Sequence, residues 1–182
     1  ASRLQNQQRP LRLYYNQSVY RNSPDLSGRS DESAQMGIEL LGASGLRADL
    51  EAISTAVAAV SACVSDFRLE IGHARLFGAL DPLGNSEAVE AIRNLPRLFG
   101  GEEALEAAEA YCRDEETAGV LRYLRKLYAS LSRLGLGEKL MVDLGLVQRN
   151  DYYTGVVFSA YVQEHGEAVL LGGRYDSLCE KF

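Results

Sequence analysis

Residues 139–173 read KLMVDLGLVQRNDYYTGVVFSAYVQEHGEAVLLGG, and this stretch decides the fold class. Three runs rich in β-branched and aromatic residues, 139–146, 152–162 and 167–173, predict three strands. The polar run 163–166 between the last two strands is typical of a tight antiparallel connection. The C-terminal third of the chain therefore predicts an antiparallel sheet.

A second group of strands is expected near the N-terminus. The run LRLYYNQSVYR at 11–21 follows a proline, and the strand pattern resumes with AQMGIELLG at 34–42. Residues 22–33 between them are dense in Ser, Asp, Gly and Pro and predict a long hairpin loop. Strands are therefore expected near both ends of the chain.

Helices are expected between these two groups of strands. Residues 46–63 have apolar positions at helical spacing and many alanines, and the pattern from 82 to 134 is helical throughout. A strand ending near Gly72, with a short helix behind it, is expected between these two helical stretches. Helices grouped between runs of antiparallel strands indicate an α+β domain and not a parallel βαβ fold.

The composition excludes several classes of function. The 182 residues, 46% of them hydrophobic, are enough for one sizeable core, and the net charge of -6 provides no positive field for nucleic acid. Cys63, Cys112 and Cys179 form no CxxC pair, and the two histidines lie in no metal-binding spacing, which argues against a zinc site. No apolar run approaches the roughly 20 residues that cross a bilayer. We expect a cytoplasmic protein with no membrane partner and no bound metal.

One face of the strand at 34–42 is polar. Gln35, Gly37 and Glu39 share this face by the period of two, while Met36 and Ile38 point to the other side. Periodicity alone favours a solvated surface for a polar face of an antiparallel sheet. The alternative is that these residues form the floor of a pocket.

Four side chains have the chemistry to bind a small amino acid. Gln35, Tyr153 and Tyr175 can orient an ammonium group or a ring N–H, and Glu39 can accept a hydrogen bond from an imidazole. Neither a nucleophile with its base nor a pair of acid–base carboxylates accompanies them, so the set indicates binding without a catalytic residue. His73 has no reactive partner near it in sequence and is interpreted as a capping or core histidine.

Four stretches together resemble the catalytic core of histidyl-tRNA synthetase, a class II synthetase, and its paralogue, the regulatory subunit of ATP phosphoribosyltransferase. They are RPLRLYYNQSVYR (9–21), QMGIELLG (35–42), VDLGLVQRNDYYTGVVF (142–158) and LLGGRYDSL (170–178). The resemblance implies a class II aminoacyl-tRNA synthetase-like antiparallel sheet flanked by helices. It also implies a single, incomplete core domain over 1–182, with a helical insertion at about 82–135 and without the motif 1 and motif 3 regions.

The resemblance assigns expected roles to five residues. Gln35 is expected to contact the α-amino group of histidine, and Glu39 and Tyr153 to recognise its imidazole. Tyr175 is expected to line the same pocket. Arg21 matches the motif 2 arginine that grips the α-phosphate and the carboxylate in class II synthetases.

The sequence departs from the synthetase where adenylation needs specific groups. Gln148 stands in place of an arginine that acts on the α-phosphate, Ser23 in place of a glutamate, and Ser33 in place of the aromatic residue that stacks on adenine. Losing that charge and that stacking platform removes transition-state stabilisation. This selective loss resembles the regulatory paralogue, a non-catalytic subunit that binds histidine and confers activation and feedback inhibition on the first step of histidine biosynthesis.

The resemblance also implies the partners. We expect a short-form ATP phosphoribosyltransferase catalytic subunit, a homodimer of this chain within a hetero-oligomer, histidine as effector, no cofactor and no tRNA. One alternative is a histidyl-tRNA synthetase core fragment, which would use ATP and Mg²⁺ to activate histidine and charge tRNA. Another is a structural interaction domain with a vestigial pocket. The chain begins without Met and ends without a cap signal, so we expect it to be part of a longer protein.

Overall fold

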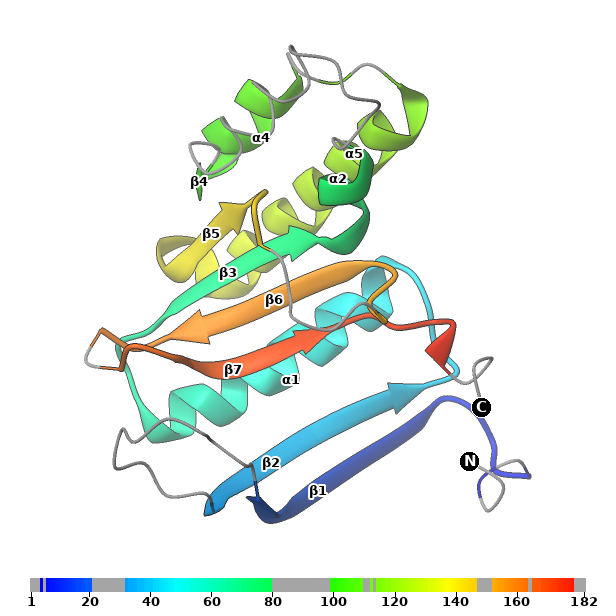
Figure 1. Ribbon diagram of the computed structural model, residues 1–182, viewed down its shortest axis with the longest axis vertical. Coiled ribbons are helices and arrows are strands. Elements are labelled where there is room, and N and C mark those ends of the chain that lie inside the picture. Colours follow the sequence, from blue (N-terminus) through cyan, green and yellow to red (C-terminus); the bar gives the residue numbers. More distant parts are fainter. Residues whose placement is uncertain are drawn as a thin grey trace.

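A computed structural model of the protein describes residues 4, 6–20, 32–79, 99–109, 112, 114–146, 152–163 and 165–178. These residues form a two-stranded hairpin and a five-stranded sheet. Helices α1 (Leu46–Cys63) and α5 (Glu115–Leu131) lie behind the larger sheet in Figure 1, and the hairpin extends below it. The arrangement confirms the expected α+β fold class.

The hairpin consists of β1 (Leu11–Tyr20) and β2 (Glu32–Leu41), and every residue of β1 pairs with one of β2 in antiparallel register. Tyr15 lies opposite Gly37, and Gln17 lies opposite Gln35. Directly opposed residues project from the same face, so these four share the face that carries Glu39. The two expected strands are confirmed, and the expected loop lies mostly outside the described residues.

The larger sheet has the strand order β4-β5-β3-β6-β7. Its strands are β4 (Phe99–Gly100), β5 (Leu140–Asp143), β3 (Arg68–His73), β6 (Val156–Tyr161) and β7 (Ala168–Gly173). Strands β3 and β5 are parallel, and the other neighbouring pairs are antiparallel. The first five residues of β6, VVFSA, are all buried. Such a continuously buried and mostly apolar run is typical of a strand covered on both faces.

One hydrophobic core joins the helices to this sheet. The largest fully buried side chains come from α1, α2 (Ala74–Ala79), α4 (Glu102–Glu109), α5 and the strands, and they are Ile53, Leu69, Ile71, Leu76, Leu105, Leu124, Leu127, Leu131, Val142, Val156 and Val157. Burial of each of these side chains stabilises the fold by about 1.5–3 kcal/mol.

At the start of α5, the Asp114 carboxylate accepts a hydrogen bond of 2.7 Å from the Thr117 N–H and caps the helix. Beyond α5 the chain forms a π turn, Ser132–Leu136, and a 3-10 turn, Gly137–Lys139.

The hairpin has its polar face turned inward. Gln35, Gly37 and Glu39 are half-buried, whereas Met36 is 65% and Ile38 39% exposed. The interpretation of the polar face as solvated surface is therefore wrong, and the pocket-floor alternative agrees with the burial. Periodicity tells which residues share a face, but only the tertiary fold determines which face is covered.

Three further expectations need correction. Strand β6 begins at Val156 and not at 152, because residues 152–155 adopt a turn that leads into it. The stretch expected to be helical throughout contains the short strand β4, which pairs with β5. The sheet is also not purely antiparallel, since β3 and β5 are parallel.

Within the described ranges, none of the helices is both long enough and apolar enough to cross a bilayer.

Candidate functional site

Three separate segments meet around the Glu39 carboxylate. Glu39 lies on the inner face of β2, Tyr152 and Tyr153 precede β6, and Tyr175 follows β7. The Tyr175 hydroxyl donates a hydrogen bond to Oε2 of Glu39, which joins residues 136 positions apart. The ring centroid of Tyr152 lies 4.7 Å from that of Tyr153 and 5.8 Å from that of Tyr175, and the Tyr153 and Tyr175 centroids lie 6.4 Å apart. The structure thus places one carboxylate beside a cluster of three aromatic rings.

Partial burial shapes the electrostatics of this cluster. Desolvation raises the pKa of the Glu39 carboxyl above its ordinary value. The pKa of the Tyr153 hydroxyl is raised as well, first by burial and then by its hydrogen bond to Tyr152 and the negative charge of Glu39. Tyr153 therefore keeps its proton at neutral pH and remains a hydrogen-bond donor.

Gln35 is oriented by a residue that the sequence analysis did not single out. Its Nε2 donates to the hydroxyl oxygen of Tyr15 at 2.7 Å. The Tyr15 ring lies against the backbone of Gly37, where an added Cβ would stand 2.4 Å from the ring carbon Cζ. Any side chain at position 37 would therefore push the Tyr15 ring aside, and the glycine within a strand pattern was the available sequence signal for such a close approach.

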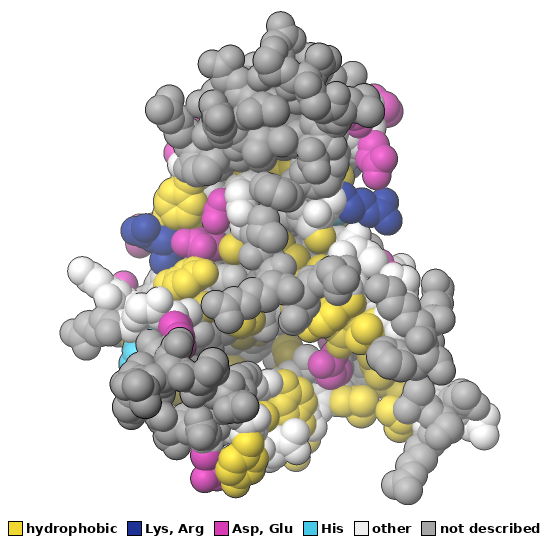
Figure 2. All heavy atoms as spheres, viewed as in Figure 1, with side chains coloured by type: hydrophobic (Ala, Val, Ile, Leu, Met, Phe, Trp, Pro, Cys, Tyr) yellow, Lys and Arg dark blue, Asp and Glu magenta, His cyan; other side chains and the backbone are white. Residues whose placement is uncertain are grey.

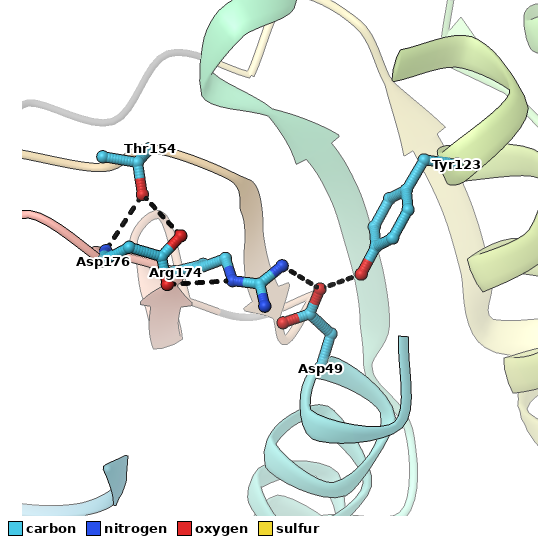
Figure 3. A network of polar contacts seen from close by, with 5 residues as sticks. All are labelled: Asp49, Tyr123, Thr154, Arg174 and Asp176. Atoms are coloured by element: carbon cyan, nitrogen blue, oxygen red, sulfur yellow. Dashed lines mark hydrogen bonds and ion pairs between the residues drawn. The ribbon is translucent and has the colours of Figure 1, made fainter. Parts of the chain in front are cut away.

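A polar network lies beside the tyrosine cluster (Figure 3). Oδ2 of Asp49, in the first turn of α1, accepts a hydrogen bond from the Tyr123 hydroxyl and lies 3.4 Å from Nη1 of Arg174. Arg174 Nε also contacts Oδ1 of Asp176 at 3.2 Å. The Thr154 hydroxyl accepts from the backbone N–H of Asp176 at 3.0 Å and donates to its carboxylate at 3.2 Å. The network connects α1, α5 and the two segments that carry Tyr153 and Tyr175.

Asp49 is a buried charge that this network satisfies. The residue is only 6% exposed. Burial raises the pKa of its carboxyl, while the Tyr123 hydrogen bond and the Arg174 charge oppose that shift. Asp49 lies on the same helical stripe as the buried Ile53, Ala56 and Val57, and a carboxylate on an apolar stripe was the sequence signal for this contact.

His73 ends β3 and caps the following helix. Its Nδ1 accepts a hydrogen bond from the Arg75 N–H at 3.2 Å, and its ring meets Tyr123 edge-on at 6.4 Å between centroids. Burial, followed by the positive charges of Arg75 and Arg174, lowers the His73 pKa to about 4. These contacts agree with the interpretation of His73 as a capping or core residue.

Arg21, Ser23 and Gln148 lie outside the described residues. Ser33 lies near the start of β2 and is exposed. In the part of the chain that the structure describes, no three His, Cys, Asp or Glu side chains gather as a metal site.

Comparisons with known proteins agree with the resemblance in the sequence. The family model described as histidyl-tRNA synthetase matches residues 1–87 and 80–182. The ATP phosphoribosyltransferase regulatory subunit of Clostridium botulinum (strain 657 / Type Ba4) is 35% identical over 95% of this chain and 49% of its own length. The chain spans about half the length of the curated relatives it matches.

Two solved structures resemble the fold closely. One is the crystal structure of an ATP phosphoribosyltransferase regulatory subunit/histidyl-tRNA synthetase from Bacillus halodurans, with a TM-score of 0.86 and 33% identity over 99% of this chain and 55% of that chain. The other is a histidine–tRNA ligase subunit from Alicyclobacillus acidocaldarius, with a TM-score of 0.72 and 26% identity over 95% of this chain and 63% of that chain.

Proposed function

Because the chain belongs to the histidyl-tRNA synthetase family, we propose that it is the core of a non-catalytic regulatory subunit of ATP phosphoribosyltransferase that binds histidine. The curated relatives bearing the regulatory-subunit name support the subunit role. One structural observation supports the ligand: Glu39, Tyr153 and Tyr175 come together although they are distant in sequence. In this role the protein acts in the cytoplasm and needs no cofactor.

The site has groups that suit the imidazole ring and the α-ammonium group of histidine. A carboxylate accepts up to four hydrogen bonds, so Glu39 can bind an imidazole N–H while it keeps its contact with Tyr175. The Tyr152, Tyr153 and Tyr175 rings offer flat apolar surface beside that carboxylate. The Tyr15 hydroxyl accepts a hydrogen bond from Nε2 of Gln35, and an amide oxygen is the kind of acceptor that an α-ammonium group needs.

Regulation then follows from linkage between two binding events. The proposed partner is the short-form catalytic subunit, and this chain is proposed to form a homodimer within the complex. Histidine inhibits the complex if it binds the inactive form more tightly than the active form, and the ratio of the two affinities sets the strength of inhibition.

The first experiment measures phosphoribosyl-ATP formation by the catalytic subunit with and without the full-length protein, across a histidine titration. We expect the protein to raise the activity and to confer inhibition by histidine. An activity that is unchanged by the protein at every histidine concentration would contradict the subunit role.

Glu39→Gln tests the ligand part of the proposal. Losing a charged hydrogen-bond acceptor costs about 1.5–3 kcal/mol, so calorimetry should show histidine binding weakened by about 10- to 150-fold. Glu115→Gln is the matched control, because the Glu115 side chain is 86% exposed on α5 and should leave binding unchanged. Equal affinity in the two variants would contradict a histidine site at Glu39.

The second candidate function is histidine activation by a synthetase core. The similarity to the Alicyclobacillus acidocaldarius ligase subunit favours it, and Gln148 argues against it. A synthetase would catalyse histidine-dependent exchange of pyrophosphate into ATP. We expect no such exchange from the full-length protein.

A further inference from the structure

The tyrosines of the site are carried by two short segments that contact each other directly. Tyr153 is followed by Thr154, and Tyr175 is followed by Asp176. The Thr154 hydroxyl binds both the backbone N–H and the carboxylate of Asp176. In addition, the Thr154 N–H donates to the carbonyl oxygen of Arg174 at 2.8 Å, and the Arg174 N–H donates to that of Val156 at 2.8 Å. The positions of Tyr153 and Tyr175 are therefore set together.

Arg174 connects this pair of segments to the buried part of the molecule. Its side chain is 18% exposed, and its Nη1 and Nε contact Asp49 and Asp176 on opposite sides (Figure 3). The stem of Arg174 crosses Gly155, where an added Cβ would stand 2.6 Å from Cδ of the arginine. A planar guanidinium can bridge two carboxylates in this way, whereas the single nitrogen of a lysine cannot present the same fork.

We propose that Arg174 is a positioning residue for the histidine site, holding the segments of Tyr153 and Tyr175 against Asp49 of α1. This inference rests on the proposed function for its ligand. The Asp49 contact with Tyr123 extends the network to α5, so the same network joins the site to the helical layer. Arg174 acts through its neighbours: its guanidinium contacts Asp49 and Asp176, and the recognition of histidine is assigned to Glu39 and the tyrosines.

Histidine binding to the full-length protein tests the proposal, with Arg174→Gln and Arg174→Lys as variants. Residues that support metal ligands typically contribute about tenfold or more to affinity, and by analogy we expect a loss of about tenfold in both variants. Arg122→Gln is the matched control, since Arg122 pairs with Glu115 on the surface and its side chain is 57% exposed. Wild-type affinity in Arg174→Gln or in Arg174→Lys would overturn the proposal.

Hydrogen exchange measured without histidine tests the positioning role of Arg174 separately from the proposed binding of histidine. The amides of Thr154 and Asp176 are both donors within the network, so Arg174→Gln should speed their exchange while α1 keeps its protection. If the wild-type protein binds no histidine, the proposed ligand fails, and unchanged exchange in Arg174→Gln independently overturns the positioning role. A purely structural role would instead speed exchange throughout the core.

Thr154→Val provides a second variant should Arg174→Gln not fold. It keeps the shape of the side chain and removes both hydroxyl bonds to Asp176. We expect weaker histidine binding and faster exchange of the Asp176 amide. Wild-type values for both would contradict the joint placement of the Tyr153 and Tyr175 segments, and the proposal would fall with it.

Discussion

Glu39 and His73 show how burial acts in opposite senses on two kinds of ionisable residue. Burial raises the pKa of the Glu39 carboxyl and lowers that of the His73 imidazole, because the neutral form is favoured in both cases. For Glu39, the folded protein holds its proton more tightly than the unfolded chain does. For His73, the unfolded chain binds the proton more tightly, so the two residues bias the pH dependence of stability in opposite directions.

His73 should make the protein less stable in acid. The pKa of His73 is about 4 in the folded protein, against an ordinary 6.5. Its contribution to the free energy of unfolding is therefore complete above pH 6.5 and is lost as pH falls towards 4. We expect the stability of the wild type relative to His73→Asn to fall by about 1–2 kcal/mol between pH 7 and pH 4, allowing for the partial exposure of the ring. Urea unfolding of both proteins between pH 4 and pH 7 measures this difference in unfolding free energy.

The asparagine is chosen because its side-chain oxygen can still accept from the Arg75 N–H. The carboxyls whose pKa is raised, those of Glu39, Asp49, Glu70 and Asp143, are common to both proteins, so their opposite effect cancels in the comparison. A difference between the two proteins that stays constant with pH would show that His73 does not titrate with a lowered pKa.

At the scale of elements, the hairpin depends on a glycine and the α5 helix does not. Gly37 of β2 lies under the Tyr15 ring, which in turn bonds to Gln35. Gly119 lies within α5, and the nearest atom to an added Cβ there would be Nη2 of Arg122 at 3.9 Å. The same substitution should therefore have opposite effects in the two elements.

Gly37→Ala should destabilise the protein by about 1–3 kcal/mol, because the methyl group displaces the Tyr15 ring. Gly119→Ala is the matched control and should stabilise by about 0.5–1 kcal/mol, because alanine is the better helix former. Thermal or urea unfolding measures both. A neutral Gly37→Ala would mean that the ring does not occupy the position described.

At the scale of the whole molecule, the helices and the sheet share one core. Leu124 and Leu127 of α5 are fully buried together with Leu69 of β3 and Ile53 of α1. Figure 2 shows hydrophobic side chains at the surface in the lower part of the view, where Figure 1 places the hairpin. The core and the hairpin thus differ in how completely their apolar side chains are covered.

Leu124→Ala should cost about 2–5 kcal/mol of unfolding free energy. Because α5 packs on the same core, we expect amide protection to fall in α1 and β3 as well as in α5, which hydrogen exchange can follow by segment. Leu134→Ala is the control, since Leu134 is 60% exposed and should change stability by less than about 0.5 kcal/mol. Loss of protection confined to α4 and α5 would indicate a separately folding helical unit.

The sequence by itself determined the local elements. Helix α1 occupies the predicted residues 46–63, and both hairpin strands lie within a few residues of their predicted positions. Apolar spacing and turn residues act within a few positions along the chain, so these elements can be derived from it directly. The motifs also identified Gln35, Glu39, Tyr153 and Tyr175 as one candidate set.

Only the tertiary structure decided which face of the hairpin is covered and which side chains support the site. Tyr15, Asp49 and Tyr123 were not predicted, because their partners depend on how distant segments pack. The contact of Asp49 with Arg174 joins positions 125 residues apart, and that of Glu39 with Tyr175 joins positions 136 residues apart. Periodicity carries no information over such separations, whereas burial and pairing of charges are settled only when the segments meet.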